Sequence, residues 1–202
     1  MIVNDNYRFL FVHIQKTGGT SITEFLFTIN GSRLEGYHHG MYSQPITRYE
    51  QYFKFCVVRN PWARLVSWYE MMRRKKVHND FSAYLLKHAH HFSDFLSQTE
   101  TIFEKNEKEW DGVNPYPKSI AFNQVDYISD GSGRILVDHI CRFERLKQEF
   151  QEICERFGIT SELLHVNRNP NSMDYRSYYS PRNADLVKVM YKKDIETFGY
   201  RF

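Results

Sequence analysis

Two short apolar runs, each followed by a turn and then by a helical pattern, place the strongest constraint on how this chain folds. Residues 8–14 (RFLFVHI) and 52–58 (YFKFCVV) are rich in β-branched and aromatic side chains, as buried parallel strands are. The glycine-containing segment 15–21 follows the first run, and Asn60-Pro61 follows the second. Because strands alternate with helices along the chain, the pattern predicts an α/β fold with a doubly wound parallel sheet and helices on both of its faces.

The rest of the chain continues this alternation. Asn60 is a favourable N-cap and Pro61 suits the first helical position, so a helix is expected to begin there. Its buried stripe is expected to consist of Trp62, Leu65, Val66, Tyr69 and Met72. The expected helices are 22–29, 62–76, stretches within 81–103, 144–157 and 182–198, and the further strand candidates are 134–137 and 139–143.

The length and composition are those of one globular domain, which we expect to span residues 1–202. Hydrophobic residues make up 42% and charged residues 25%, which excludes a disordered chain and a coiled-coil rod. The net charge of +3 is too small to indicate a nucleic-acid-binding protein. No apolar run reaches the roughly 18 residues that a membrane span requires, so no membrane-spanning segment is expected.

The N-terminal residues and the cysteines bear on the compartment. Residues 1–5 (MIVND) lack the basic stretch and apolar core of a signal peptide, so we expect a cytoplasmic protein. The three cysteines, Cys56, Cys141 and Cys154, form an odd set in apolar or amphipathic surroundings. This favours reduced thiols over a disulfide framework or a cysteine-based zinc site.

The segment after the first strand has the features of an anion-binding loop. Its two glycines allow backbone N–H groups to gather around an anion, and the helix that follows adds its positive end. Three hydroxyl groups and one lysine could supply further contacts to the anion. The loop consists of Lys16, Thr17, Gly18, Gly19, Thr20 and Ser21. This is not a Walker A loop, because the lysine precedes the glycines instead of following them. A plain strand-to-helix turn is the alternative.

The second strand ends at Arg59, and ligands of open α/β sheets bind at such strand ends. Arginine is suited to bidentate binding of phosphate, and Ser67 on the following helix offers a hydroxyl. In the alternative, Arg59 pairs with a carboxylate at the end of the strand. Two separate anion sites at two strand ends suit a nucleoside that carries phosphate groups at both ends.

The two segments HIQKTGGTS (13–21) and FKFCVVRNPWARLVSWY (53–69) resemble the two cofactor signatures of sulfotransferases that use 3′-phosphoadenosine 5′-phosphosulfate. The closer likeness is to carbohydrate sulfotransferases of the heparan 2-O, chondroitin and HNK-1 type. It continues through NQVDYI (123–128), RFERL (142–146) and HVN (165–167) to the C-terminal residues, and so spans about 8–202. Relatives from eukaryotes carry a Golgi anchor and stem that this sequence does not show, so the resemblance implies a soluble, bacterial-like member with a P-loop-like sulfotransferase fold.

The resemblance implies roles for individual residues. The segment from Lys16 to Ser21 would hold the 5′-phosphosulfate, and Lys16 would stabilise the bridging oxygen as the phosphate leaves. Arg59 and Ser67 would hold the 3′-phosphate, and Arg176, in a late segment that varies in the family, would lie near it. The family needs no metal, so none is expected here.

The resemblance also implies a catalytic histidine between the two cofactor segments, about twenty residues before the arginine of the second. His39 precedes Arg59 by 20 residues and His38 by 21, and His39 is slightly preferred. A histidine there would take the proton of the acceptor hydroxyl. A pair of loop histidines without a chemical role is the alternative.

The acceptor is expected to be a carbohydrate or another molecule that bears a hydroxyl. Aromatic residues make up 16% of the chain, and their rings could either stack on sugar faces or simply pack the core. Two other functions stay open at this point: a P-loop nucleotide kinase or NTPase, and a nucleotide- or polyanion-binding module without catalysis.

Overall fold

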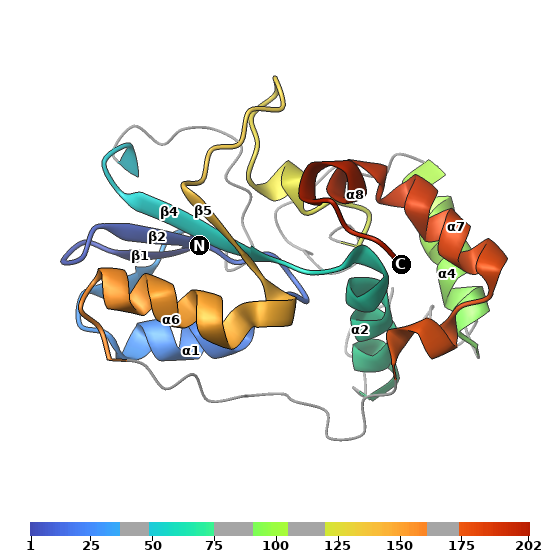
Figure 1. Cartoon of the computed structure of the whole chain (residues 1–202), viewed down its shortest axis with the longest axis horizontal. Helices are drawn as coiled ribbons and strands as arrows, with labels where there is room; N and C mark the ends of the chain where they lie inside the picture. The colour runs from blue at the N-terminus through green and yellow to red at the C-terminus, as the bar shows by residue number, and fades with distance from the viewer. Residues whose placement is uncertain (37–48, 75–90, 105–119, 161–173) are drawn as a thin grey trace. The chain divides into compact units, whose positions relative to one another are not determined.

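The computed structural model describes residues 1–36, 49–74, 91–104, 120–160 and 174–202 (Figure 1). The chain forms two compact units. The first unit consists of Met1–Arg59 and Gln124–Pro170, and the second of Asn60–Asn123 and Asn171–Phe202. The boundary between them falls directly after Arg59, the residue that follows the second predicted strand.

The first unit contains the sheet, which has five strands among the described residues, in the order β3-β1-β2-β4-β5. The strand β4 pairs in parallel with β2 and with β5, whereas β1 is antiparallel to both β2 and β3. The expectation of a wholly parallel sheet is therefore wrong, and the sheet is mixed. The cause is the short link between β1 and β2, because parallel neighbours need a long crossover. The strands are β1 (Ile2–Asn4), β2 (Phe9–Val12), β3 (Ser32–Leu34), β4 (Phe53–Val58) and β5 (His139–Arg142).

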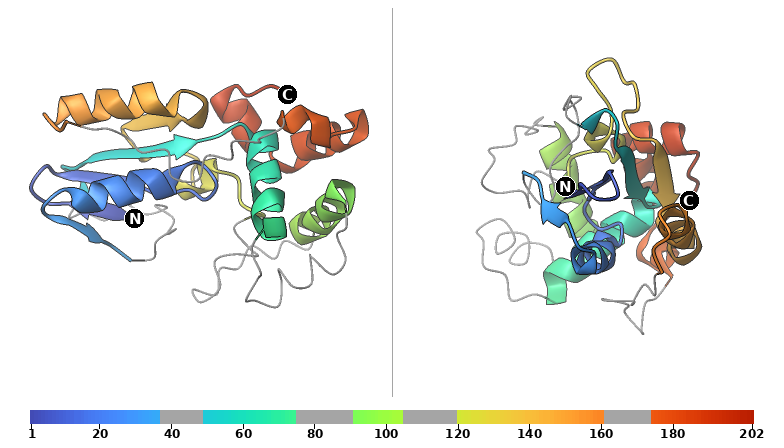
Figure 2. Two further views of the ribbon diagram at one scale, coloured as in Figure 1. Left: turned by 90° about the horizontal axis from the view of Figure 1, so that it is seen from below. Right: turned by 90° about the vertical axis from the view of Figure 1, so that its left-hand side faces the viewer.

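Two helices of the first unit, α1 (Gly19–Thr28) and α6 (Leu146–Arg156), lie on the same face of the sheet (Figures 1 and 2). The rings of Phe25 on α1 and Phe150 on α6 meet edge to face, with their centroids 5.6 Å apart. The core beneath them is built from Ile2, Phe9, Phe11, Ile22, Leu26, Phe55, Val57, Cys141, Phe150, Ile153 and Cys154. Strand residues of the opposite face are buried as well. Helices on both faces stay a prediction, because the described α-helices of this unit cover one.

The parallel strands end at a common edge. Val12, the last residue of β2, lies opposite Cys56 of β4, and Val58, the last residue of β4, lies opposite Arg142 of β5. The segments that follow these strands therefore leave the sheet side by side. This edge is where the two predicted anion sites lie.

The second unit is helical and contains α2 (Pro61–Arg74), α4 (Phe92–Glu104), α7 (Pro181–Met190), α8 (Lys192–Phe198) and the short 3-10 helix η4 (Tyr175–Tyr178). The predicted cap is confirmed, because Asn60 Oδ1 accepts the N–H groups of Trp62 at 3.1 Å and Ala63 at 3.2 Å. The predicted stripe of α2 is also confirmed, since all five of its residues are buried. Within the described ranges, no helix is long and apolar enough to cross a membrane.

Two predicted elements differ from the structure. The predicted helix 182–198 is divided at Tyr191, a buried residue whose hydroxyl donates to the Ile120 carbonyl at 2.6 Å. The strand predicted at 134–137 is wrong, because the segment makes only an isolated bridge between Ile135 and Ser129.

The start of α1 depends on a close approach between two segments. The predicted helix 22–29 begins three residues earlier, at Gly19, and a Cβ atom on Gly19 would lie 2.1 Å from Cδ2 of His13. His13 is itself buried, and its Nδ1 lies 3.2 Å from the Thr23 hydroxyl on the next turn of α1. The imidazole ring therefore fills the space that any side chain at position 19 would need.

We expect Gly19→Ala to lower the free energy of unfolding by about 1–3 kcal/mol, the usual cost of overpacking, measured by urea denaturation. Gly131→Ala is the matched control, because no atom lies within 4 Å of its added Cβ. That control should change stability by no more than about 0.5 kcal/mol. In a His13→Ala background the cost of Gly19→Ala should shrink. An undiminished cost would show that the ring is not the cause.

Candidate functional site

The loop between β2 and α1 has an unusual backbone. Lys16 has a φ of 67° and Gly18 a φ of 84°, both in the left-handed region, which is rarely adopted by a residue with a side chain such as Lys16. The Thr17 side chain is buried, and its hydroxyl donates to the Ile14 carbonyl at 2.8 Å. Thr17 therefore helps to hold the shape of the loop, and its backbone N–H is the group it could offer to an anion.

The first turn of α1 provides a positive electrostatic end. This ten-residue helix has no acidic residue in its first turn, so its N-terminal N–H groups and dipole are not offset by a carboxylate there. Thr20 is exposed, and Lys16, Gly18 and Ser21 are half-buried. These residues border the N-terminus of the helix, where a phosphate or sulfate group would be favoured.

Arg59 lies next to this loop, within the same unit. Its Nη1 donates to the Lys16 carbonyl at 3.3 Å, and its guanidinium carbon lies 4.1 Å from the centroid of the Phe143 ring. The structure thus brings together the ends of β2 and β4, where the sequence predicts two separate anion sites. The contacts that hold the Arg59 side chain include a carbonyl group and an aromatic face.

The end of β5 adds further charged groups to the same edge. The Arg142 N–H donates to the Glu149 carboxylate, and Arg145 Nη2 lies 2.6 Å from Glu149 Oε1. Glu149 is buried near the start of α6, and these contacts satisfy its carboxylate. The Glu149 carboxylate therefore bonds the backbone of Arg142 and the side chain of Arg145, which lie where β5 passes into α6.

The cysteines of the first unit are poor candidates for nucleophiles. Cys56, Cys141 and Cys154 are buried, and burial raises the pKa of the Cys56 thiol well above its usual value. Burial, with a smaller contribution from Glu149, raises the pKa of Cys141 to about 12. Because the thiolate is the reactive form, these two thiols are inert at neutral pH.

Two predicted donor-binding residues lie in the second unit. Ser67 is a half-buried residue of α2, and Arg176 is an exposed residue of η4. The Arg176 guanidinium lies 4.6 Å from the Tyr175 ring centroid and 3.4 Å from Asp174 Oδ1. Their role in binding stays a prediction.

Both candidates for the catalytic base, His38 and His39, lie outside the described residues. Another histidine, His88, also lies outside them. His91 is described, and its backbone N–H donates to Asp94 Oδ2 at 3.0 Å at the start of α4. In the described parts of the chain, no group of three or more His, Cys, Asp or Glu residues could hold a metal ion.

The sequence assigned no role to two residues that contact Arg59, namely Phe143 and Gln124. Phe143 directly follows β5, so the rule that ligands bind at the ends of parallel strands could have drawn attention to it. Gln124 is 65 residues from Arg59 in the chain, and its side chain bonds both backbone groups of that residue. No local pattern signals such a distant contact.

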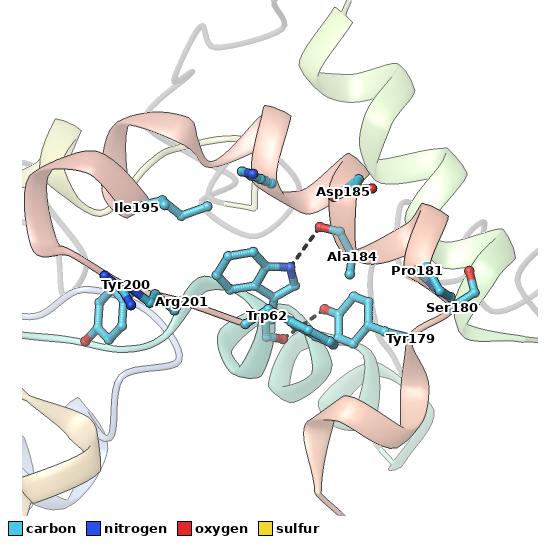
Figure 3. Close-up of a pocket in the computed structure, with 11 residues that line it drawn as sticks. Trp62, Tyr179, Ser180, Pro181, Ala184, Asp185, Ile195, Tyr200 and Arg201 are labelled. Atoms are coloured by element: carbon cyan, nitrogen blue, oxygen red, sulfur yellow. Dashed lines mark hydrogen bonds between the residues drawn. The ribbon is translucent and has the colours of Figure 1, made fainter.

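A cavity of about 490 Å³ lies in the second unit (Figure 3). The Trp62 indole N–H donates to the Ala184 carbonyl at 2.9 Å, and the Tyr179 hydroxyl donates to the Trp62 carbonyl at 2.9 Å, as Figure 3 shows. The cavity is lined by Trp62, Tyr179, Ser180, Pro181, Ala184, Asp185, Lys188, Ile195, Tyr200, Arg201 and Phe202. None of the predicted site residues belongs to this lining.

Comparisons with known proteins assign this chain to a family. The family model described as the sulfotransferase family matches residues 1–201, which is nearly the whole chain. Neither the curated proteins nor the solved structures contain a match to this sequence. Because this family model matches nearly the whole chain, the chain belongs to the sulfotransferase family.

Proposed function

We propose that this protein transfers a sulfuryl group from 3′-phosphoadenosine 5′-phosphosulfate to a hydroxyl group of a carbohydrate acceptor. The observation that carries the proposal is the contact between Arg59 and the Lys16 carbonyl, which joins two anion-binding elements at one edge of the sheet. A donor with phosphate groups on both its 5′ and 3′ sides would need two such elements. Membership of the sulfotransferase family supports sulfuryl transfer as the reaction.

The loop residues fit the 5′ end of this donor. The left-handed backbone at Lys16 and Gly18 and the N-terminus of α1 form a setting for the anionic phosphosulfate. The close approach of His13 leaves no space for a side chain at Gly19, so in this proposal position 19 offers the donor only its backbone N–H. In this proposal, Lys16 to Ser21 hold the 5′ phosphosulfate, and Arg59, with Ser67 and Arg176, holds the 3′-phosphate.

The reaction is an in-line displacement at sulfur. The bond from sulfur to the bridging phosphate oxygen breaks, its electrons stay on that oxygen, and a new bond forms to the acceptor oxygen. The Lys16 ammonium group stabilises the negative charge that grows on the leaving phosphate. His39, or His38, takes the acceptor proton, so that the products are the sulfate ester and adenosine 3′,5′-bisphosphate. No metal ion is assigned to any of these steps.

The nature of the acceptor rests on the sequence resemblance to carbohydrate sulfotransferases. The aromatic residues give this part of the proposal less support, because many of the rings pack together in the core. In the first unit, for example, Phe9 and Phe11 both contact Phe55 at centroid distances of 6.1 and 5.1 Å. A panel of oligosaccharides and small alcohols, tested with sulfur-labelled donor, therefore decides the acceptor class.

The donor class is tested by thermal denaturation with nucleotides. Adenosine 3′,5′-bisphosphate without Mg²⁺ should raise the melting temperature of the protein, because a ligand that binds only the folded state stabilises it. Stabilisation by ATP that requires Mg²⁺ would instead favour a kinase. Stabilisation by the bisphosphate without any transfer of labelled sulfate would indicate a binding module.

We expect Arg59→Ala to raise the Kd of adenosine 3′,5′-bisphosphate by about 100-fold or more, because it removes a charged contact to the 3′-phosphate. The Kd of adenosine 5′-phosphosulfate, which lacks that phosphate, should change far less. Arg134→Ala is the matched control, since it removes the same charge from an exposed turn where Arg134 pairs with Asp130 at 3.2 Å. Calorimetry with both ligands checks the result, and equal weakening of both would make Arg59 a structural residue.

Lys16→Ala should lower turnover with every acceptor by about 10²–10³-fold, because the lysine acts on the leaving group. The exposed residue Lys147 on α6 offers a control variant of the same charge, Lys147→Ala, which should keep normal turnover. Steady-state transfer of labelled sulfate measures both variants. Acceptor-dependent losses in Lys16→Ala would contradict a role at the leaving group.

His39→Ala should lower turnover by about 10²–10⁴-fold while leaving donor affinity nearly unchanged. The loss should be smaller for acidic acceptors such as nitrophenols, which need little help to lose their proton. The acidic limb of the pH–rate profile, produced by protonation of the base, should also disappear. If only His38→Ala shows these effects, His38 is the base. If both single variants and the double variant keep full activity, the base is neither of these two histidines.

A further inference from the structure

The backbone of Arg59 is held on both sides by one side chain. Gln124 Oε1 accepts the Arg59 N–H at 2.8 Å, and Gln124 Nε2 donates to the Arg59 carbonyl at 2.8 Å. Gln124 is fully buried. In an antiparallel sheet, a neighbouring strand bonds both the N–H and the C=O of a paired residue, and Gln124 makes the same two bonds to Arg59. The hydrogen bonding of β4 therefore continues one residue beyond Val58.

The chemistry of this contact requires an amide at position 124. A primary amide combines an acceptor and a donor in one planar group, so it can bond a backbone N–H and a backbone C=O together. A carboxylate offers no donor, and a thioether of the same length offers neither strong group. Gln124 therefore fixes the position and direction of Arg59 at the end of the strand.

The side chain of Arg59 is held by Phe143. The guanidinium carbon lies 4.1 Å from the ring centroid, within the range of a cation–π contact. The same ring borders the anion-binding loop, because a Cβ atom on Gly18 would lie 2.9 Å from Phe143 Cε2. Phe143 is half-buried and packs against the core of the first unit, so it gives the guanidinium a firm support.

We infer that Gln124 and Phe143 are positioning residues that set how strongly the protein selects nucleotides with a 3′-phosphate. Gln124 holds the backbone of Arg59, Phe143 holds its guanidinium, and the Lys16 carbonyl accepts one of its N–H groups. This inference rests on the proposed function of Arg59. It gives two residues that do not themselves bind the 3′-phosphate a part in selecting the donor.

The test compares the Kd values of adenosine 3′,5′-bisphosphate and adenosine 5′-phosphate, measured by calorimetry on the full chain. Gln124→Met keeps the length of the side chain and removes both bonds, and it should reduce the preference for the 3′-phosphate by about 10-fold or more. Gln148→Met is the matched control, because Gln148 is exposed on α6 and bonds only Glu152 among the contacts described for it. That variant should keep the preference of the unmodified protein.

The ring is tested with a conservative pair of variants. Phe143→Leu should reduce the preference for the 3′-phosphate by about 3- to 10-fold, whereas Phe143→Tyr, which keeps the aromatic face, should retain it. These two Phe143 variants also test the inference if Gln124→Met does not fold. In an Arg59→Ala background, neither Gln124→Met nor Phe143→Leu should lower the preference further, because both act through Arg59.

The outcomes separate this inference from the proposed function. A preference that is present in the unmodified protein and lost in Arg59→Ala supports the proposed function by itself. If that preference then survives in Gln124→Met and Phe143→Leu, the inference is overturned while the proposed function stands. If the unmodified protein shows no preference for the 3′-phosphate, both are overturned.

Discussion

The parallel pairing of β4 with β2 on one side and β5 on the other is the interaction on which the rest of the first unit depends. It brings the ends of three strands to one edge, so that the Lys16 loop, Arg59 and Phe143 leave the sheet next to one another. Residues separated by more than 120 positions in the chain thereby share one small region. Once this register is set, the Arg59 guanidinium reaches both the Lys16 carbonyl and the Phe143 ring.

The second requirement is close packing behind the loop. His13 occupies the space at Gly19 and contacts Thr23, and the Phe143 ring occupies the space next to Gly18. The glycine pair is therefore needed for two different reasons. Gly18 takes a left-handed backbone, and Gly19 leaves space for an imidazole ring. In the proposed function, such packing holds the N–H groups of the loop in place before the donor arrives, which lowers the entropy lost on binding.

Much of this arrangement follows from local patterns in the sequence. The strands β2 and β4, the cap at Asn60 and the buried stripe of α2 could be predicted because each is encoded by neighbouring residues. The strands β1 and β3 were missed, since three-residue strands are too short to show an alternating pattern. The support of Arg59 by Gln124 could not be predicted either, because it joins residues that are distant in the chain and only the folded sheet brings them together.

The left-handed backbone of Lys16 has a consequence for how this protein can change. A residue with a side chain in that conformation costs roughly 1–2 kcal/mol, and glycine would avoid the cost. In the proposed mechanism, the ammonium group of Lys16 is required at this place in the loop, which gives a reason for keeping the strain. Under that mechanism, selection for stability alone would favour glycine at position 16, whereas selection for turnover would keep the lysine. The proposed mechanism therefore sets stability against catalysis at a single backbone torsion.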